Sequence, residues 1–386
     1  MPAPGIRHHR RQCRRLPVSR GGRGRSSTLH RPARRLRQAG RPALARQGHH
    51  VRHRYGISLG VSPREPLSRT AELARAVDDS GFEALWYIDF QLGMKDVYAA
   101  MNLAALSTEN VLIGAGVTNL VTRHPTVTAN ATAALDELSG GRAVLGLGAG
   151  WSAVLGAGGA PSRINDLRSG IDEFRQLFSG EPCDLYGTQV RLATAERQIP
   201  VYLAVSQPAM LRLAGETCDG AVLMGAADPE FCSWQLDYIH QGLEAAGRDR
   251  RQLTIDLFVT MSVGDDTASA IDDVRAWATS QAATFHPWKR MPPAWERFRG
   301  EFARAAGAYG LVDHLSLQAE HKHTVSDDFV KSVALAGDLD TCVDRLRQLW
   351  QLDIDRITFA LLSGGREQRL AYLADTVIRA VEAGGS

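Results

Sequence analysis

The first 54 residues lack the side chains from which a folded core is built. They hold 16 arginines and six histidines but no acidic residue and no Phe, Trp or Tyr, and the first such aromatic is Tyr55. A segment of this composition cannot bury enough apolar surface to offset the entropy lost on ordering. We therefore expect a disordered or non-native arm over 1–54 and a folded region over 55–386.

Three interpretations of the arm compete. Its arginines would bind phosphate in nucleic acid, and targeting peptides are also rich in Arg and Ser and poor in acids. The third interpretation is an upstream extension or a misassigned start, because Arg, Gly, Pro, Ala and His dominate, as GC-rich DNA read in any frame would give. We favour the third, and expect no nucleic-acid partner. The arm has no apolar run typical of a secretory signal.

Other absences narrow the class of protein. No apolar run approaches the roughly 18 residues of a membrane span. The five cysteines are scattered and form no CxxC pair, so neither a zinc site nor a disulfide framework is indicated. Residues 55–386 hold 29 of the 45 basic residues and all 42 acidic ones, a net charge of −13. These features favour a cytoplasmic protein in a reducing setting, without a metal site or a membrane partner.

From Tyr55 onward, predicted strands and helices alternate. Each strand is a short apolar run and most are followed by an amphipathic helix. The predicted strands are Tyr55–Leu59, Ala84–Ile88, Val111–Gly116, Arg142–Leu147, Val201–Val205, Gly220–Leu223, Leu253–Val263 and Asp355–Leu361. Eight such units predict an α/β fold, the (β/α)8 or TIM barrel, over an open doubly wound sheet.

Two segments interrupt this rhythm and are predicted to be insertions. Trp151–Ser162 is rich in glycine and alanine, and we expect it to be mobile. His286–Leu335 contains several aromatic residues and histidines. Loops of this length inside a compact domain are usually lids or binding loops. A surface helical hairpin that only packs on the barrel is equally compatible with its length.

The stretch Gly141–Ser152, GRAVLGLGAGWS, organises the rest of the chain. A buried strand runs into Gly148, Ala149 and Gly150, where small residues let a ligand approach the backbone. Parallel barrels place their ligands at the carboxyl ends of their strands. A tight strand exit with no ligand explains these glycines as well.

Several stretches in order carry a resemblance to a known family. They are SGFEALWYID, IGAGVTNLVTRHP, ALDELSGGRAVLGLGAG, IPVYLAVSQPAMLRLAGETCDGAVLMG and VALAGDLDTCVDRLRQL. With them, residues 55–386 resemble the bacterial luciferase-like monooxygenase superfamily. Within it, the chain is similar to the branch that uses the deazaflavin coenzyme F-420 and includes methylenetetrahydromethanopterin reductase. The resemblance implies a luciferase-like barrel that binds F-420, or FMN as the alternative cofactor.

The resemblance also implies where the cofactor lies. Asp89, after the second strand, matches an acid that contacts the ring region; a plain loop or capping acid is the alternative. Gly116, Val117 and Asn119 match a bulge that carries a non-proline cis peptide behind the ring, at the Gly116–Val117 bond. His124, which follows, is expected to be a structural residue at a helix start.

Two further stretches complete the predicted site. By the resemblance, Gly148, Ala149 and Gly150 line the ring and its side chain. Ala204, Val205, Ser206 and Gln207 end one strand and open a helix whose free N–H groups suit the cofactor's phosphate. A Ser206 N-cap followed by Pro208 explains this last stretch equally well.

Two positions depart from the pattern of related dehydrogenases. Phe90 stands where a proton-transferring His is common, and Trp151 stands where an acid is found in some members. No catalytic side chain is therefore assigned. We expect an oxidoreductase that transfers hydride between F-420 and a small organic substrate. An FMN-dependent monooxygenase and a non-catalytic flavin-binding barrel are the alternatives. Relatives commonly dimerise, and the apolar helices between Asp96 and Leu138 would supply the face for a homodimer.

Overall fold

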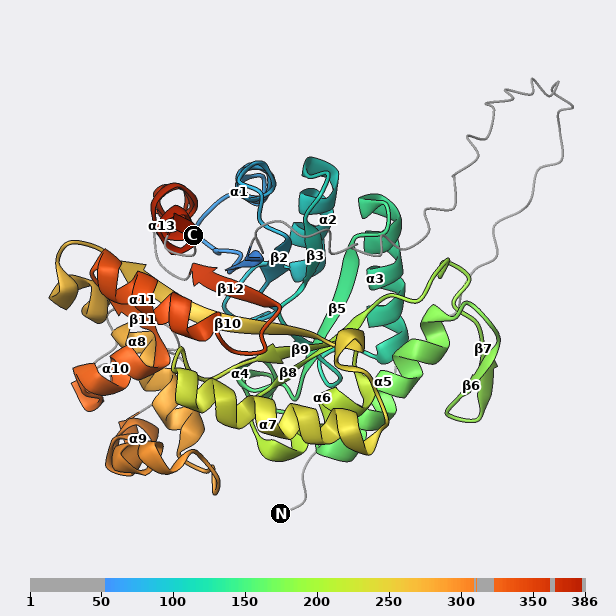
Figure 1. Ribbon diagram of the computed structural model, residues 1–386. Coiled ribbons are helices and arrows are strands. Elements are labelled where there is room, and N and C mark those ends of the chain that lie inside the picture. Colours follow the sequence, from blue (N-terminus) through green and yellow to red (C-terminus); the bar gives the residue numbers. More distant parts are fainter. Residues whose placement is uncertain (1–52, 309, 311–322, 362–364, 384–386) are drawn as a thin grey trace, which may run out of the picture. The chain divides into compact units, whose positions relative to one another are not determined.

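The computed structural model describes residues 53–308, 310, 323–361 and 365–383. Eight parallel strands in these ranges pair in a ring, because β10 pairs with both β9 and β12. Figure 1 shows them as the inner layer of the molecule. They are β1 (Tyr55–Leu59), β2 (Ala84–Tyr87), β3 (Leu112–Ala115), β5 (Ala143–Gly148), β8 (Val201–Val205), β9 (Gly220–Leu223), β10 (Thr254–Val263) and β12 (Arg356–Leu361). The predicted (β/α)8 barrel is confirmed.

The main helices lie outside the strands and bury their apolar faces against them (Figure 1). They are α1 (Arg69–Asp79), α2 (Val97–Ser107), α3 (Pro125–Ser139), α5 (Ile164–Phe178), α6 (Pro208–Thr217), α7 (Pro229–Ala245), α8 (Thr267–Phe285), α11 (Leu339–Leu349) and the closing run α12 (Arg366–Tyr372), η5 (Leu373–Ile378) and α13 (Arg379–Ala383). Aspartate side chains cap several of them; Asp266, for example, accepts from the N–H groups of Ala268 and Ser269. These capping bonds mark the residues at which the helices begin.

Several short elements were not predicted. They are β4 (Thr118–Asn119), which pairs with β5; α4 (Ser152–Gly156); the hairpin of β6 (Cys183–Leu185) and β7 (Thr188–Val190); η1 (Arg250–Gln252); and β11 (Leu335–Gly337), which pairs with β10. The strands and η1 have only two or three residues, too few to show a hydrophobic period, and α4 spans little more than one helical turn. The segment 151–162, expected to be a mobile insertion, contains the helix α4.

The described part of the second insertion packs as a small core of its own. It forms η2 (Pro293–Phe298), α9 (Arg299–Ala308) and α10 (Asp327–Val333), which lie beside α8 (Figure 1). Phe285, Trp295 and Phe329 are buried in this core. The described residues thus match a helical unit packed on the barrel. Residues 311–322 lie outside the described residues, so a lid role stays a prediction, as do the arm at 1–54 and its boundary.

The barrel interior is filled by a few large side chains. Trp86 packs against Tyr202 and Phe258, with ring centroids 5.7 and 5.8 Å away. Nearer the amino ends of the strands, Arg356 and Asp256 form an ion pair with no solvent exposure, and the Arg356 Nε donates to Asp256 Oδ2 at 2.8 Å. Thr358 donates to the other carboxylate oxygen at 2.7 Å. The interior is thus a packed core rather than a channel.

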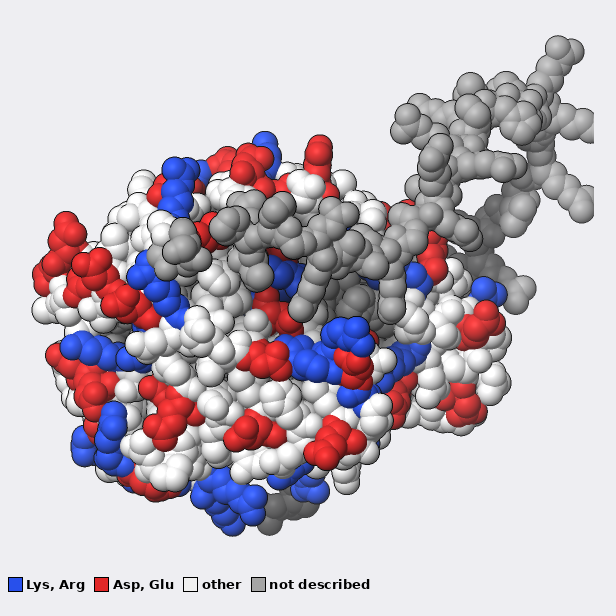
Figure 2. Space-filling model, viewed as in Figure 1, with Lys and Arg blue, Asp and Glu red and all other residues white. Residues whose placement is uncertain are grey.

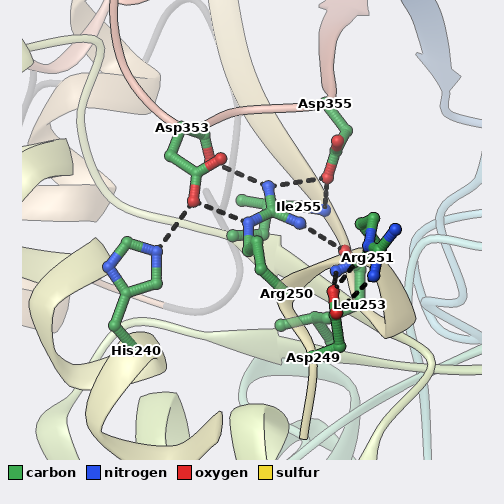
Figure 3. Close-up of polar contacts among 8 residues, drawn as sticks. All are labelled: His240, Asp249, Arg250, Arg251, Leu253, Ile255, Asp353 and Asp355. Atoms are coloured by element: carbon green, nitrogen blue, oxygen red, sulfur yellow. Dashed lines mark hydrogen bonds and ion pairs between the residues drawn. The ribbon is translucent and has the colours of Figure 1, made fainter. Parts of the chain in front are cut away.

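A polar cluster fastens the connections that precede β10 and β12 (Figure 3). The Arg250 guanidinium donates to Asp353 Oδ2 at 2.6 Å and to Asp355 Oδ2 at 2.8 Å. His240, from α7, lies 2.8 Å from the same Asp353 oxygen. Asp355 also accepts from the N–H of Ile255. One arginine therefore links two chain segments that are about a hundred residues apart.

On the face shown in Figure 2, basic and acidic side chains of the described residues are interspersed rather than gathered by sign. Among the helices that the structure describes, none has the length and apolar character needed to cross a membrane.

Candidate functional site

The predicted residues gather at the carboxyl ends of β3, β5 and β8. Along each strand, alternate residues face the barrel interior. Val144 and Tyr202 face inward, so Gly148 and Ala204 lie on the same interior face, closer to the strand ends. A Cβ placed on Gly148 would lie 3.7 Å from the Ala204 Cβ. The predicted stretches 148–150 and 204–207 are therefore neighbours in space.

The segment after β3 turns inward through a cis peptide bond between Gly116 and Val117, as predicted. It then pairs with β5, with Asn119 opposite Gly148. A Cβ on Gly148 would lie 2.7 Å from Val117 Cγ2, and one on Gly116 would lie 2.8 Å from the Trp86 Cβ. Glycine is required at both positions because the backbone packs directly on these side chains.

Gly150 follows with a φ of +81°, a conformation that favours glycine. A Cβ there would collide with Val154 and lie 3.0 Å from the Asn119 Cβ. Asn119 is buried, and its Oδ1 accepts from the N–H groups of Val121 and Thr122. Its carbonyl oxygen thus shapes the loop. Ala149, between the glycines, is half-buried.

Asp89 is buried at this end of β2 and is held by two neighbours. The Arg123 guanidinium binds both carboxylate oxygens, and the Thr118 hydroxyl donates to Oδ2 at 2.7 Å. The Arg123 side chain is itself mostly buried and lies over the Tyr98 ring. Asp89 thus ties the segment after the cis peptide to β2. The role of Arg123 was not predicted, since nothing in the neighbouring sequence marks its partner. The next residue, His124, is the N-cap of α3, as expected.

The start of α6 offers backbone donors and a hydroxyl. The helix begins at Pro208 and its N-cap is Gln207, which makes no side-chain capping bond. The N-cap alternative for Ser206 is therefore wrong, because Ser206 lies one position before the cap. Within the described residues its hydroxyl has no hydrogen-bond partner. The Val205 side chain instead packs between barrel and helices, so only its backbone is available to a ligand.

Among the buried polar atoms that lack a partner within the described residues are Thr260 Oγ1, Trp86 Nε1 and Thr122 Oγ1. Asp256 and Phe258 face the interior, so alternation places Thr260 on the same face of β10, closer to the mouth. Thr260 was not predicted as a site residue, although the alternation along its strand indicates its inward face. A buried hydroxyl without a partner is a feature of a ligand site.

A cavity of about 480 Å³ lies at the opposite end of the barrel, lined by His53, Asp79, Glu83 and Glu382 among others. It contains none of the predicted site residues. Within the described ranges, no group of three or more His, Cys, Asp or Glu side chains is placed to hold a metal ion.

Comparisons with known proteins show which family this chain is similar to. The chain is 28% identical over 326 residues to a 5,10-methylenetetrahydromethanopterin reductase of Methanolobus tindarius, covering 82% of this chain and 98% of the relative. An F-420-dependent glucose-6-phosphate dehydrogenase of Microbacterium testaceum is 33% identical over 221 residues, covering 52% and 66% of the two chains.

One solved structure with the same fold is the F-420-dependent tetrahydromethanopterin reductase of Methanopyrus kandleri. The match has a TM-score of 0.67 at 23% identity and covers 84% of this chain and 99% of that one. The model of the luciferase-like monooxygenase family matches residues 45–356. The match spans most of the chain, and the chain therefore belongs to the luciferase-like monooxygenase family.

Proposed function

We propose that the protein is an oxidoreductase that transfers hydride between coenzyme F-420 and a small organic substrate. The proposal is supported by relatives that match nearly from end to end and are named as F-420-dependent or as methylenetetrahydromethanopterin reductases. The observation that carries it is the pairing of two features at one end of the barrel. The first is the close packing around Gly148, which leaves no room for a side chain. The second is the neighbouring start of α6, which has no side-chain cap and where the Ser206 hydroxyl has no partner among the described residues.

The residues present fit such a cofactor. The N–H groups in the first turn of α6 and the Ser206 hydroxyl would hold its phosphate. Gly148, Ala149 and Gly150 would let the ring system approach the backbone, with Val117 behind it. When bound, the deazaflavin supplies the hydride chemistry, and the protein supplies binding and orientation.

The chain's own side chains offer little proton transfer here. Asp89 is engaged by Arg123 and Thr118. Phe90 and Trp151 carry no titratable group. In this proposal the protein therefore binds and orients the two reactants and excludes water, and rate enhancement comes from positioning.

The alternative cofactor is FMN, because the family is named for monooxygenases. Turnover separates the two. Reduced F-420 is mixed with the protein and a panel of ketones and imines, and the return of the absorbance band of oxidised F-420 is followed. We expect substrate-dependent reoxidation. Oxygen uptake with reduced FMN, without any F-420 reoxidation, would overturn the proposal in favour of the monooxygenase.

We also propose that two copies associate through α2 and α3. Leu106 on α2 and Val127 on α3 are large apolar side chains with 69% and 57% of their surface exposed. Exposed apolar side chains on neighbouring helices are typical of an interface. The molecular mass in solution tests this: a dimer is expected, and a monomer at micromolar concentration would contradict it.

A further inference from the structure

Three large apolar side chains remain exposed around the mouth of the candidate site. Leu92 is 66% exposed, and Val121 and Trp151 are each 46% exposed. They follow the carboxyl ends of β2, β4 and β5. Each therefore lies on a loop at the end of the barrel where the site residues gather.

Close packing around α4 brings these three loops together. A Cβ on Gly156 would lie 3.1 Å from Leu92 Cδ1, and one on Gly159 would lie 3.3 Å from Val121 Cγ1. The Gln91 side chain also donates to the Ala153 carbonyl at 2.8 Å. Leu92 and Val121 thus flank α4, and Trp151 lies at its amino end. We call these three exposed side chains around α4 the apolar rim.

Trp151 differs from every other tryptophan of the chain. The other six are buried or pack against a hydrophobic core: Trp86, Trp234, Trp277, Trp288, Trp295 and Trp350. Trp151 has no ring partner among the described residues, and it directly follows Gly150. An indole left half in solvent beside a glycine turn presents a flat apolar surface to whatever occupies the mouth.

Three charged side chains close to this rim in the chain, those of Asp89, Lys95 and Arg123, have partners of their own. Asp89 and Arg123 bind each other. The Lys95 ammonium donates to the Glu65 carbonyl. None of the three is free to hold a phosphate or carboxylate of a substrate at the rim.

We propose that Trp151, with Leu92 and Val121, forms a substrate wall that selects an uncharged, apolar ring compound and disfavours sugar phosphates. This inference rests on the proposed function, because it takes the neighbouring glycines as the cofactor side of the site. It makes Trp151 a specificity-determining residue that contacts substrate by stacking.

Equilibrium binding to the full-length protein tests the wall. F-420 affinity is measured first, by fluorescence quenching. Binding of 2-acetonaphthone, a flat uncharged ketone, and of glucose 6-phosphate to the F-420-loaded protein is then measured by saturation-transfer NMR and competition. The variants are Trp151→Ala, Trp151→Phe and, as a matched exposed aromatic on α12, Tyr372→Ala.

We expect wild type to bind the ketone more tightly than the sugar phosphate. Trp151→Ala should weaken ketone binding about tenfold, because a stacked ring and its buried area are lost. Trp151→Phe should restore most of it, and Tyr372→Ala should bind as wild type. All variants should keep the F-420 affinity.

Unchanged ketone binding in Trp151→Ala, or tighter binding of glucose 6-phosphate by wild type, overturns the wall and leaves the proposed function standing. Failure of wild type to bind F-420 overturns the proposed function, and the wall with it. Loss of F-420 binding in Trp151→Ala alone places the indole on the cofactor and also overturns the wall.

Discussion

At the scale of single residues, the carboxyl end of the barrel contains glycines that a larger residue could replace only at a cost in stability. Gly150 combines a positive φ with close contact to Val154 and Asn119. Gly158 has a similar φ, +77°, but a Cβ placed there would meet no described atom within 4 Å. The pair therefore separates the cost of the backbone conformation from the cost of lost space.

Substitution of the two glycines by alanine makes that comparison. Gly158→Ala should lower the free energy of unfolding by about 1 kcal/mol, the cost of the left-handed conformation. Gly150→Ala should lower it by about 2–3 kcal/mol and weaken F-420 binding, because Val154 must shift. Urea unfolding measures both. Equal losses of unfolding free energy in the two variants would contradict this, because they would show that Val154 and Asn119 shift at little cost.

Asp89 is predicted to act through Arg123 rather than alone. Asp89→Asn should lower the free energy of unfolding by about 2–3 kcal/mol, because it leaves a largely buried guanidinium without its counter-charge. Thermal unfolding measures the loss. Asp96→Asn is the control: Asp96 is exposed and 4.0 Å from Arg123, and Asn caps a helix as well as Asp does. An unchanged unfolding temperature in Asp89→Asn would contradict the structural role of the Asp89–Arg123 pair.

At the scale of elements, the start of α6 is predicted to serve a ligand more than the helix. Ser206→Ala should leave the unfolding temperature unchanged and weaken F-420 binding several-fold, because the hydroxyl caps nothing. A true cap behaves differently. Asp266→Ala should lower the free energy of unfolding by about 1 kcal/mol, since Asp266 caps α8. A stability loss in Ser206→Ala with unchanged F-420 affinity would contradict the assignment.

The Arg250 cluster gives a prediction about acid stability. Burial alone would raise the pKa of Asp353. Hydrogen bonds from Arg250 and His240 lower it by a larger amount, so the pKa of this carboxyl lies below its ordinary value. A carboxyl with a lowered folded-state pKa adds stability above its unfolded pKa, and that stability is lost as the pH falls through the folded pKa. The folded protein should therefore lose part of its stability below about pH 4.

Arg250→Met should remove that contribution. We expect a loss of about 1–2 kcal/mol at pH 7, modest because the cluster is partly exposed, and a shallower fall of stability in acid. Urea midpoints from about pH 3 to about pH 7 measure both. Arg251→Met is the control, because its side chain is 84% exposed and pairs only with Asp249 among the described residues. Parallel curves for Arg250→Met and wild type would refute the linkage to Asp353.

At the scale of the whole molecule, the strands and helices of the barrel were predictable and the contacts between loops were not. β1, β8 and β9 begin and end at the predicted residues, because each is a short apolar run that starts after a polar residue or a proline. The barrel followed from counting such units. The short strands β4 and β11 carry no such period, and they form only because β5 and β10 present an edge to them.

The candidate site was predictable in part for the same reason. Gly148 and Gly150 were proposed from their place after a buried strand, and the cis bond at Gly116–Val117 from resemblance. The partners of Asp89 were not, since Arg123 lies 34 residues further along the chain. The unpartnered hydroxyl of Thr260, as the described residues have it, also required the structure, because sequence alternation shows a face but not a missing partner.

Binding of F-420 to this barrel is tested most directly by titration. The full-length protein is titrated separately with F-420 and with FMN while intrinsic and cofactor fluorescence are followed, with Ser206→Ala alongside. Our account predicts tight binding of F-420, weaker or no binding of FMN, and weaker F-420 binding by the variant. Preference for FMN, or no binding of either cofactor, would contradict it.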